Sequence, residues 1–163
     1  MFVCSPVSPE WVPFAFSTPL GILEGSTDSK TGIIGSLGFT DAEIPEGPAN
    51  QEGGSLLEFL IRLRPLRLPI AEQPFFQRVY EELSEVPAGQ TITYKALAER
   101  AGRPSAARAV GQAVARNPIC LLIPCHRVLP CRGDVGNFRW GVERKKALLD
   151  LEKNGQDAWE VLG

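Results

Sequence analysis

The chain is poor in the residues that build metal sites and disulfide frameworks. It has one histidine, His126, and four cysteines, Cys4, Cys120, Cys125 and Cys131. No two of these cysteines form a C-x-x-C pair, and a single imidazole does not complete a zinc-binding Cys/His set. We therefore expect no bound metal, and free thiols of the kind found in a reducing intracellular compartment.

Long apolar runs are also missing. No stretch approaches the roughly 20 consecutive apolar residues of a membrane-spanning helix. The opening MFVCSPVSPEWVPFAF lacks a basic start and is interrupted by prolines, unlike a secretory signal. We expect an intracellular protein with no membrane partner.

The net charge of the whole chain is close to zero, but the charges are unevenly distributed along the sequence. The formal value of −2 combines an acidic start, with 5 Lys/Arg and 12 Asp/Glu in residues 1–93, and a basic stretch, with 11 and 3 in residues 94–146. A concentrated basic segment is the electrostatic footprint that a polyanion such as DNA would bind. A solvated basic face is the alternative explanation of such an excess.

The first part of the chain predicts short strands and turns. FAFSTPLGILEGSTD and GIIGSLGF carry aromatic and β-branched residues broken by Gly, Pro, Asp and Ser. Residues 41–55 resemble an exposed loop, residues 56–63 have helical spacing, and residues 64–74 carry three prolines, as a connector would. We expect a small α/β N-terminal lobe over 1–70, followed by a mainly α C-terminal lobe over 71–163.

The C-terminal lobe shows helical periodicity. Helices are predicted over 74–86, with Pro74 at the start, over 93–102, closed by Gly102, and over 105–118. The last two, joined by a tight turn, form a helix-turn-helix pattern. A plain helical hairpin is the alternative.

The helix at 105–118 carries little side-chain bulk. Alanine and glycine occupy six of its positions, while Arg108 and Arg116 project from it. A helix that reads bases in the major groove normally presents several Asn, Gln, Arg or Lys side chains. A slim face with one long arginine fits a minor groove better. The alternative is that the small residues pack against the core.

Cys125 follows an apolar run at a point where regular structure is expected to end. ICLLI, residues 119–123, has the character of a buried strand, and Cys120 within it is expected in the core. Pro124 ends the run, and reactive side chains are common where the chain leaves regular structure.

His126 is the natural proton partner of Cys125. Neighbours in a strand point to opposite faces, so a bridging water is the more plausible link between them. A thiol is mostly protonated at neutral pH and needs a base or a positive field to become a nucleophile. A carboxylate would hold the imidazole ring, and Glu152 and Asp150 are both candidates.

At this point the chain resembles a known family. AARAVGQAVARNP, LLIPCHRV, GNFRWG and ERKKALLDLE are similar to motifs of the O6-alkylguanine-DNA alkyltransferases, also called methylated-DNA–protein-cysteine methyltransferases. The similarity runs from Phe75 to Glu152, and the Pro-Cys-His-Arg-Val box is highly specific. Residues 1–70 share only the general character of the family's variable first lobe.

The resemblance implies a mechanism of direct DNA repair. Cys125 would accept the alkyl group from O6-alkylguanine in a single-turnover reaction, with His126 as its base through water and Glu152 orienting the ring. Tyr94 would help protonate the departing guanine, and Asn117 would fix the turn that carries the cysteine. The damaged base is flipped out of the stack, because O6 cannot otherwise meet a buried thiolate.

The resemblance also implies the binding surfaces. Double-stranded DNA would be bound through its minor groove by a monomer, with Arg108 filling the stack after base flipping and no cofactor involved. The DNA-binding residues would be Arg108, Ala107, Arg116 and Arg127, and the substrate pocket would be lined by Tyr94, Val128, Phe138, Arg139 and Trp140.

The pocket loop departs from the family pattern. Phe138 stands where a tyrosine is common, and Arg139 and Trp140 replace residues that are small in many members. Some members bind zinc in the first lobe, but this chain has no histidine there and a single cysteine, so we expect none.

Three other functions compete with this interpretation. A non-enzymatic sensor of alkyl lesions would lack the cysteine nucleophile, and a helix-turn-helix regulator needs no Cys-His pair. In a thiol hydrolase the cysteine and histidine normally meet across the fold rather than as neighbours. Cys125 and its context favour the alkyltransferase.

Overall fold

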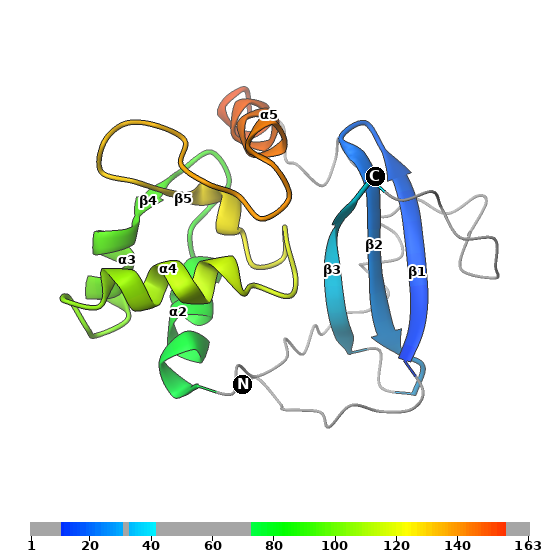
Figure 1. Cartoon of the computed structure of the whole chain (residues 1–163), viewed down its shortest axis with the longest axis horizontal. Coiled ribbons are helices and arrows are strands. Elements are labelled where there is room, and N and C mark those ends of the chain that lie inside the picture. The colour runs from blue at the N-terminus through cyan, green and yellow to red at the C-terminus, as the bar shows by residue number, and fades with distance from the viewer. Residues whose placement is uncertain (1–10, 31–32, 42–72, 156–163) are drawn as a thin grey trace. The chain divides into compact units, whose positions relative to one another are not determined.

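The computed structural model describes residues 11–30, 33–41 and 73–155. The chain divides into two compact units, one of residues 1–70 and 159–163 and the other of residues 71–158. Within the described residues the first unit is a small antiparallel sheet and the second is mainly helical (Figure 1). This agrees with the predicted fold class of a small first lobe and a mainly α second lobe.

The sheet of the first unit is a three-stranded meander in the order β1-β2-β3. It comprises β1 (Trp11–Thr18), β2 (Gly21–Asp28) and β3 (Ile34–Thr40), where strands were predicted. The turn between β1 and β2 is tight because the Thr18 hydroxyl donates to the Gly21 carbonyl at 2.6 Å. The buried side chains of the three strands include Phe14 and Phe16 in β1, Leu23 in β2, and Leu37 and Phe39 in β3.

Parts of the first lobe cannot be compared with the prediction. The helix expected at 56–63 lies outside the described residues. So do the loop expected at 41–55, apart from Asp41, and the connector at 64–74, apart from Pro74.

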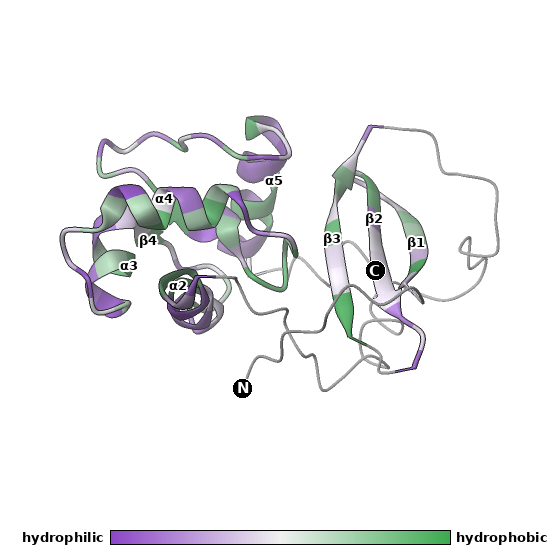
Figure 2. Cartoon of the chain, turned by 60° about the horizontal axis from the view of Figure 1, so that its bottom comes forward, coloured by the Kyte–Doolittle hydropathy of each residue, from purple (hydrophilic) through white to green (hydrophobic). Residues whose placement is uncertain are grey.

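The second unit begins with three helices that pack against one another. They are α2 (Pro74–Ser84), α3 (Tyr94–Arg100) and α4 (Ala107–Ala115), each starting and ending within three residues of its predicted bounds. Figure 2 shows apolar and polar stretches alternating along α4, as expected of a helix that buries one face.

Helix α3 is capped at its start and is followed by a tight turn into α4. Thr93 caps α3 by accepting a hydrogen bond from the Ala96 amide at 3.1 Å, and Gly102 follows the helix with a φ of +80°. A left-handed residue just after a helix is the role predicted for this glycine.

Two short elements connect these helices to the end of the unit. A 3₁₀ turn, η1 (Cys125–Arg127), leads into β5 (Val128–Leu129), which pairs in parallel with β4 (Ile92–Thr93). The final helix, α5 (Val142–Lys153), contacts η1. Because β4 leads directly into α3, this pairing holds the first residue of α3 close to the segment that carries Cys125.

Candidate active site

Asn117 organises the segment between α4 and Cys125. Its side chain is fully buried, and Nδ2 donates to the Ile123 carbonyl at 2.8 Å while Oδ1 accepts from the Ile119 amide at 3.0 Å. One amide group thus closes both ends of the apolar run, as predicted for the residue that fixes this turn.

The run itself is a turn, and the strand predicted at 119–123 is wrong. The Leu122 amide donates to the Cys120 carbonyl at 2.8 Å, and Leu121 has a φ of +68°, which no strand residue adopts. Burial was predicted correctly, since Cys120 is fully buried. Apolar composition reports burial, and it does not distinguish a buried strand from a buried turn.

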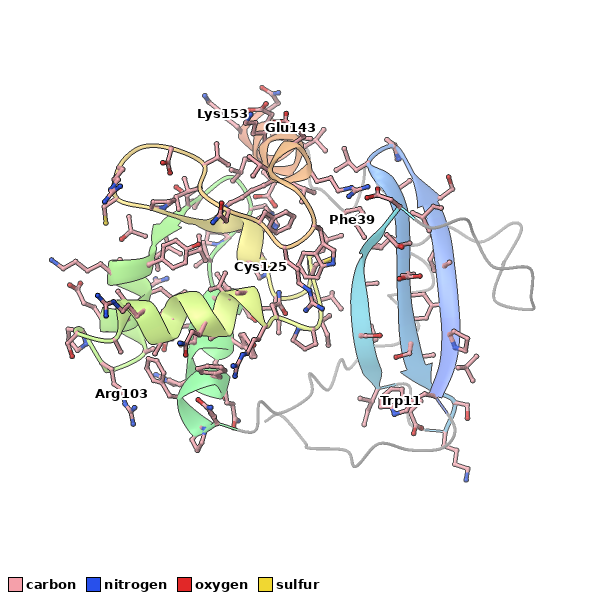
Figure 3. The ribbon with its side chains drawn as sticks, viewed as in Figure 1. Trp11, Phe39, Arg103, Cys125, Glu143 and Lys153 are labelled. Atoms are coloured by element: carbon pink, nitrogen blue, oxygen red, sulfur yellow. The ribbon has the colours of Figure 1, made fainter. Side chains whose placement is uncertain are left out.

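Cys125 lies in the interior of the second unit, near α4 (Figure 3). Its side chain is 2% exposed, and burial raises the pKa of the thiol to about 11. A hydrogen bond from Asn117 and the positive charge of Lys145 both act to lower that pKa. Burial outweighs them, so the thiol is protonated at neutral pH and needs a base to react.

His126 follows Cys125 in the chain and its ring is held by a carboxylate. Its Nε2 lies 2.8 Å from Oε1 of Glu152, which is the partner chosen by the structure, because Asp150 is exposed. An ionised carboxylate only accepts hydrogen bonds, so Nε2 carries the proton and Nδ1 of the neutral ring keeps a free lone pair. Nδ1 is buried and has no hydrogen-bond partner among the described residues.

The charge states agree with this tautomer. Burial lowers the pKa of His126 despite the hydrogen bond and charge of Glu152, so the ring is neutral at pH 7. Burial acts to raise the pKa of Glu152, but hydrogen bonds from His126 and Arg127 and their charges bring it down to about 2. The pair therefore consists of a neutral imidazole and a carboxylate.

Arg127 has a different place from the one predicted. It was expected to contact DNA, but it is 8% exposed, its Nε and Nη2 donate to Glu152, and its Nη1 donates to the Val86 carbonyl. Its charge compensates the buried carboxylate. The structure thus corrects the expectation that Arg127 contacts DNA. Its guanidinium is buried and donates its hydrogen bonds to Glu152 and Val86.

Lys145 is a buried charged residue near Cys125 that was not expected from the sequence. It is 1% exposed, and its Nζ donates to the carbonyls of Val128 at 2.8 Å and Asn137 at 3.3 Å. Burial lowers its pKa, while the neighbouring Cys125 acts to raise it. The available signal was its spacing: Lys145 precedes Glu152 by seven residues, which puts both on one face of α5.

Cys125 opens onto a cavity of about 420 Å³. Of the predicted pocket residues, Tyr94, Phe138, Arg139 and Trp140 line it, whereas Val128 is fully buried and pairs with Ile92 instead. Four further residues line the cavity that were not expected from the sequence: Gly111, Val114, Ala115 and Asn137. The first three share one face of α4, a spacing that helical periodicity could have revealed.

The wall formed by the pocket loop is largely aromatic. The rings of Phe138 and Trp140 meet edge to face at 5.3 Å, and Arg139 Cζ lies 5.5 Å from the centroid of the Trp140 ring. Tyr94 stands at the start of α3, and burial, followed by the nearby Cys125, raises the pKa of its hydroxyl. Trp140 thus contacts both of its neighbours in the loop wall, Phe138 and Arg139, while Tyr94 stays a proton donor at neutral pH.

Helix α4 also carries the residues expected to bind DNA. Arg108 and Arg116 are exposed and Ala107 is half-buried. The guanidinium of Arg116 lies 5.8 Å from the centre of the Phe76 ring. No Cβ placed on Gly111 would meet another residue within 4 Å in the described part of the chain, so the helix is slim where it borders the cavity.

The described residues offer no arrangement that could hold a metal ion. No three His, Cys, Asp or Glu side chains in these ranges come together in that way. None of the helices in the same ranges has the length and apolar character that crossing a bilayer requires.

The second unit matches a known protein family. The family profile described as "6-O-methylguanine DNA methyltransferase, DNA binding domain" matches residues 74–154. The methylated-DNA–protein-cysteine methyltransferase of Mycobacterium leprae is 44% identical over 101 residues, which is 62% of this chain. The matched region spans 58% of the length of that relative.

Two further relatives extend the similarity to the first unit. The methylated-DNA–protein-cysteine methyltransferase of Saccharolobus islandicus is 37% identical over 147 residues, covering 84% of this chain and 92% of the relative. A crystal structure described as Mycobacterium tuberculosis OGT in complex with DNA has a TM-score of 0.71 at 28% identity and covers 91% of this chain and 97% of that one.

Proposed function

The chain belongs to the O6-alkylguanine-DNA alkyltransferase family, and we propose that it repairs alkylated DNA by moving an alkyl group from guanine O6 to its own Cys125. The observation that carries this proposal is the arrangement of Cys125 at the cavity, followed in the chain by a histidine whose buried Nδ1 is free to accept a proton. The relatives and the DNA complex described above support it.

The transfer needs a thiolate only at the moment of reaction. His126 Nδ1 accepts the proton of Cys125 through a water, because a resting pKa of about 11 keeps the thiol protonated beforehand. Glu152 stabilises the resulting imidazolium at 2.8 Å. The positive charge of Lys145 stabilises the developing thiolate, since it already lowers the pKa of the thiol.

The bond changes are those of an in-line displacement. Sγ forms a bond to the alkyl carbon, the bond from that carbon to O6 breaks, and its electron pair stays on the guanine. The Tyr94 hydroxyl, which lines the same cavity, donates toward the leaving guanine. Overall one proton moves from the thiol to guanine: His126 takes the thiol proton through the water, Tyr94 gives its own proton to guanine, and the imidazolium returns a proton to Tyr94.

The substrate must come to the cavity, because a thiol that is 2% exposed cannot reach a base inside a duplex. We propose that the lesion is flipped into the cavity and that α4 approaches the minor groove, with Arg108 filling the gap in the stack. Arg116 would bind phosphate, and Ala107 would let the helix approach closely. The protein would act as a monomer inside the cell.

Intact-mass measurement tests the proposal. Protein mixed with excess duplex DNA containing O6-methylguanine should gain the mass of one methyl group, mapped to Cys125, and then stop, because a thioether has no good leaving group. Cys125→Ser is the control and should gain nothing. Repeated turnover would contradict single use, and DNA binding without any mass gain would favour the lesion sensor instead.

A further inference from the structure

Arg139 is the charged member of the cavity wall. Nine described residues line the cavity, and Arg139 alone among them carries a full charge at neutral pH. The others are small, apolar, aromatic or amide side chains and the protonated Cys125. A ligand in this cavity therefore meets a single fixed positive charge in an otherwise neutral wall.

The guanidinium of Arg139 has donors to spare. Its Nη1 makes a long hydrogen bond of 3.4 Å to the Asn117 carbonyl, and its Cζ lies 5.5 Å from the Trp140 ring centroid. No carboxylate pairs with it among the residues that the structure describes. A guanidinium has five N–H donors in a planar fork that matches a carboxylate, so most of its capacity is left for a ligand.

The two contacts also hold the side chain in place. Stacking on Trp140 and the bond to the loop after α4 keep the charge at the wall, where it is exposed to solvent. Its influence extends inward, because the positive charges of Arg116 and Arg139 both act to lower the pKa of the buried Tyr80, although burial raises that pKa overall.

From this geometry we propose that Arg139 makes the protein favour O6-alkyl groups that end in a carboxylate over neutral groups of the same size. This inference rests on the proposed alkyl transfer. A carboxylate beside Cys125 would repel the developing thiolate, and a facing guanidinium offsets that repulsion while donating hydrogen bonds to the substrate.

The chemistry of such a transfer is unchanged. With a carboxymethyl group, Sγ bonds to the methylene carbon and the methylene–O6 bond breaks. The electron pair and one proton go to guanine, and the carboxylate stays ionised throughout. The product is an S-carboxymethyl cysteine at position 125, which adds a negative charge that a methyl product lacks.

The test compares two isosteric substrates. Duplexes carry either O6-carboxymethylguanine or its neutral amide analogue O6-carbamoylmethylguanine, and single-turnover alkylation of Cys125 is followed by mass. The quantity measured is the ratio of the two rates, in which effects on DNA binding and base flipping cancel. Arg139→Gln should lower this ratio about two- to fivefold, the range expected for an exposed ion pair. Arg139→Lys should retain most of it.

Salt gives a second measurement on the unmodified protein. Raising the ionic strength from about 0.05 to about 0.5 M should lower the same ratio, because an exposed charge pair is screened. A ratio unchanged by Arg139→Gln and by salt would overturn the inference, as would equal losses on both substrates, which indicate a phosphate contact. O6-methylguanine tests the proposed function separately. If the native protein does not transfer the methyl group to Cys125, the proposed function fails; if it transfers methyl but the ratio is unchanged, only the inference about Arg139 fails.

Discussion

Arg127 donates to both carboxylate oxygens of Glu152, from Nε at 3.2 and 3.0 Å and from Nη2 at 2.6 Å. The same carboxylate accepts from His126 at 2.8 Å and from the Gly89 amide at 3.2 Å. Glu152 is therefore fixed from three directions, and its orientation sets that of the imidazole beside Cys125.

Removing Arg127 should damage the fold more than DNA binding. Arg127→Ala leaves Glu152 buried without its main counter-charge, so we expect the free energy of unfolding to fall by about 3–5 kcal/mol. Denaturant unfolding measures this. Arg116→Ala is the matched control and should barely change stability while weakening DNA binding in a salt-dependent way. A stable Arg127→Ala protein with weak DNA binding would restore Arg127 as a DNA contact.

Stability should decline on acidification. The pKa of Glu152 is about 2 in the folded protein against 4.5 ordinarily, so its contribution is present above pH 4.5 and lost as the pH falls toward 2. The lowered pKa of His126 acts in the same direction, starting below pH 6.5. Urea unfolding at several pH values should show both losses. Glu152→Gln should remove the part below pH 4.5, on the order of 2–3 kcal/mol, and a curve unchanged by that substitution would contradict the assignment.

Cys125 should react slowly with small electrophiles in the free protein. Its pKa of about 11 keeps the thiolate scarce at neutral pH, and its burial blocks access, whereas Cys131 is exposed. With iodoacetamide at pH 7.5, peptide mass mapping should find Cys131 modified well before Cys125. Modification of Cys125 should accelerate about tenfold for each pH unit up to the limit of folding stability, following the thiolate fraction. Equal labelling of the two at pH 7.5 would show that the thiol is already activated.

Trp140 should restrict the size of the alkyl group. Its indole is part of the cavity wall and its ring lies 5.3 Å from that of Phe138, so we expect it to take up space that a bulky benzyl group would need. Trp140→Gly should accelerate alkylation of Cys125 by O6-benzylguanine about ten- to a hundredfold, the usual cost of overpacking, with little effect on O6-methylguanine. An unchanged or slower benzyl reaction would mean that the indole stacks on the ring and helps it.

Arg108 should matter for duplex DNA and little for a free base. If it fills the gap left by the flipped nucleotide, Arg108→Ala should reduce methyl transfer from a duplex at least about tenfold more than transfer from free O6-methylguanine, since unstacking costs a few kcal/mol. Rates of Cys125 alkylation by both substrates measure this. Equal losses on the two would place Arg108 in folding or in the pocket.

Most of the described strands and helices could be predicted from local sequence patterns. The strands follow runs of aromatic and β-branched residues broken by turn residues, the helices have one apolar face with a helical period, and Gly102 follows α3 because a left-handed residue is needed there. The neighbours Cys125 and His126, which we propose to be catalytic, were visible as motif residues. Residue chemistry alone left Glu152 and Asp150 open; the family resemblance pointed to Glu152, and the structure shows why, because the packing of α5 on η1 brings that carboxylate to the ring.

The misses have a common physical origin. Arg127 and Lys145 are charged residues that the fold buries, and a count of basic residues assigns both to the surface. Val128 was expected in the pocket, but it is buried and pairs with Ile92 in a short parallel sheet. The two residues are far apart in the sequence, so no local sequence pattern reveals this contact. The turn at 119–123 depends on one buried amide, Asn117, whose bonds to Ile119 and Ile123 do not alter the apolar pattern.

At Gly111 the stability of helix α4 and the width of the cavity favour different residues. A glycine inside a helix lowers stability by about 1 kcal/mol relative to alanine, and here no described neighbour would collide with an added methyl group. The fold alone would thus be better served by alanine at this position. Laboratory selection for thermal resistance alone would be expected to discard this glycine early, narrowing the cavity that it borders, so such selection should be paired with an activity screen.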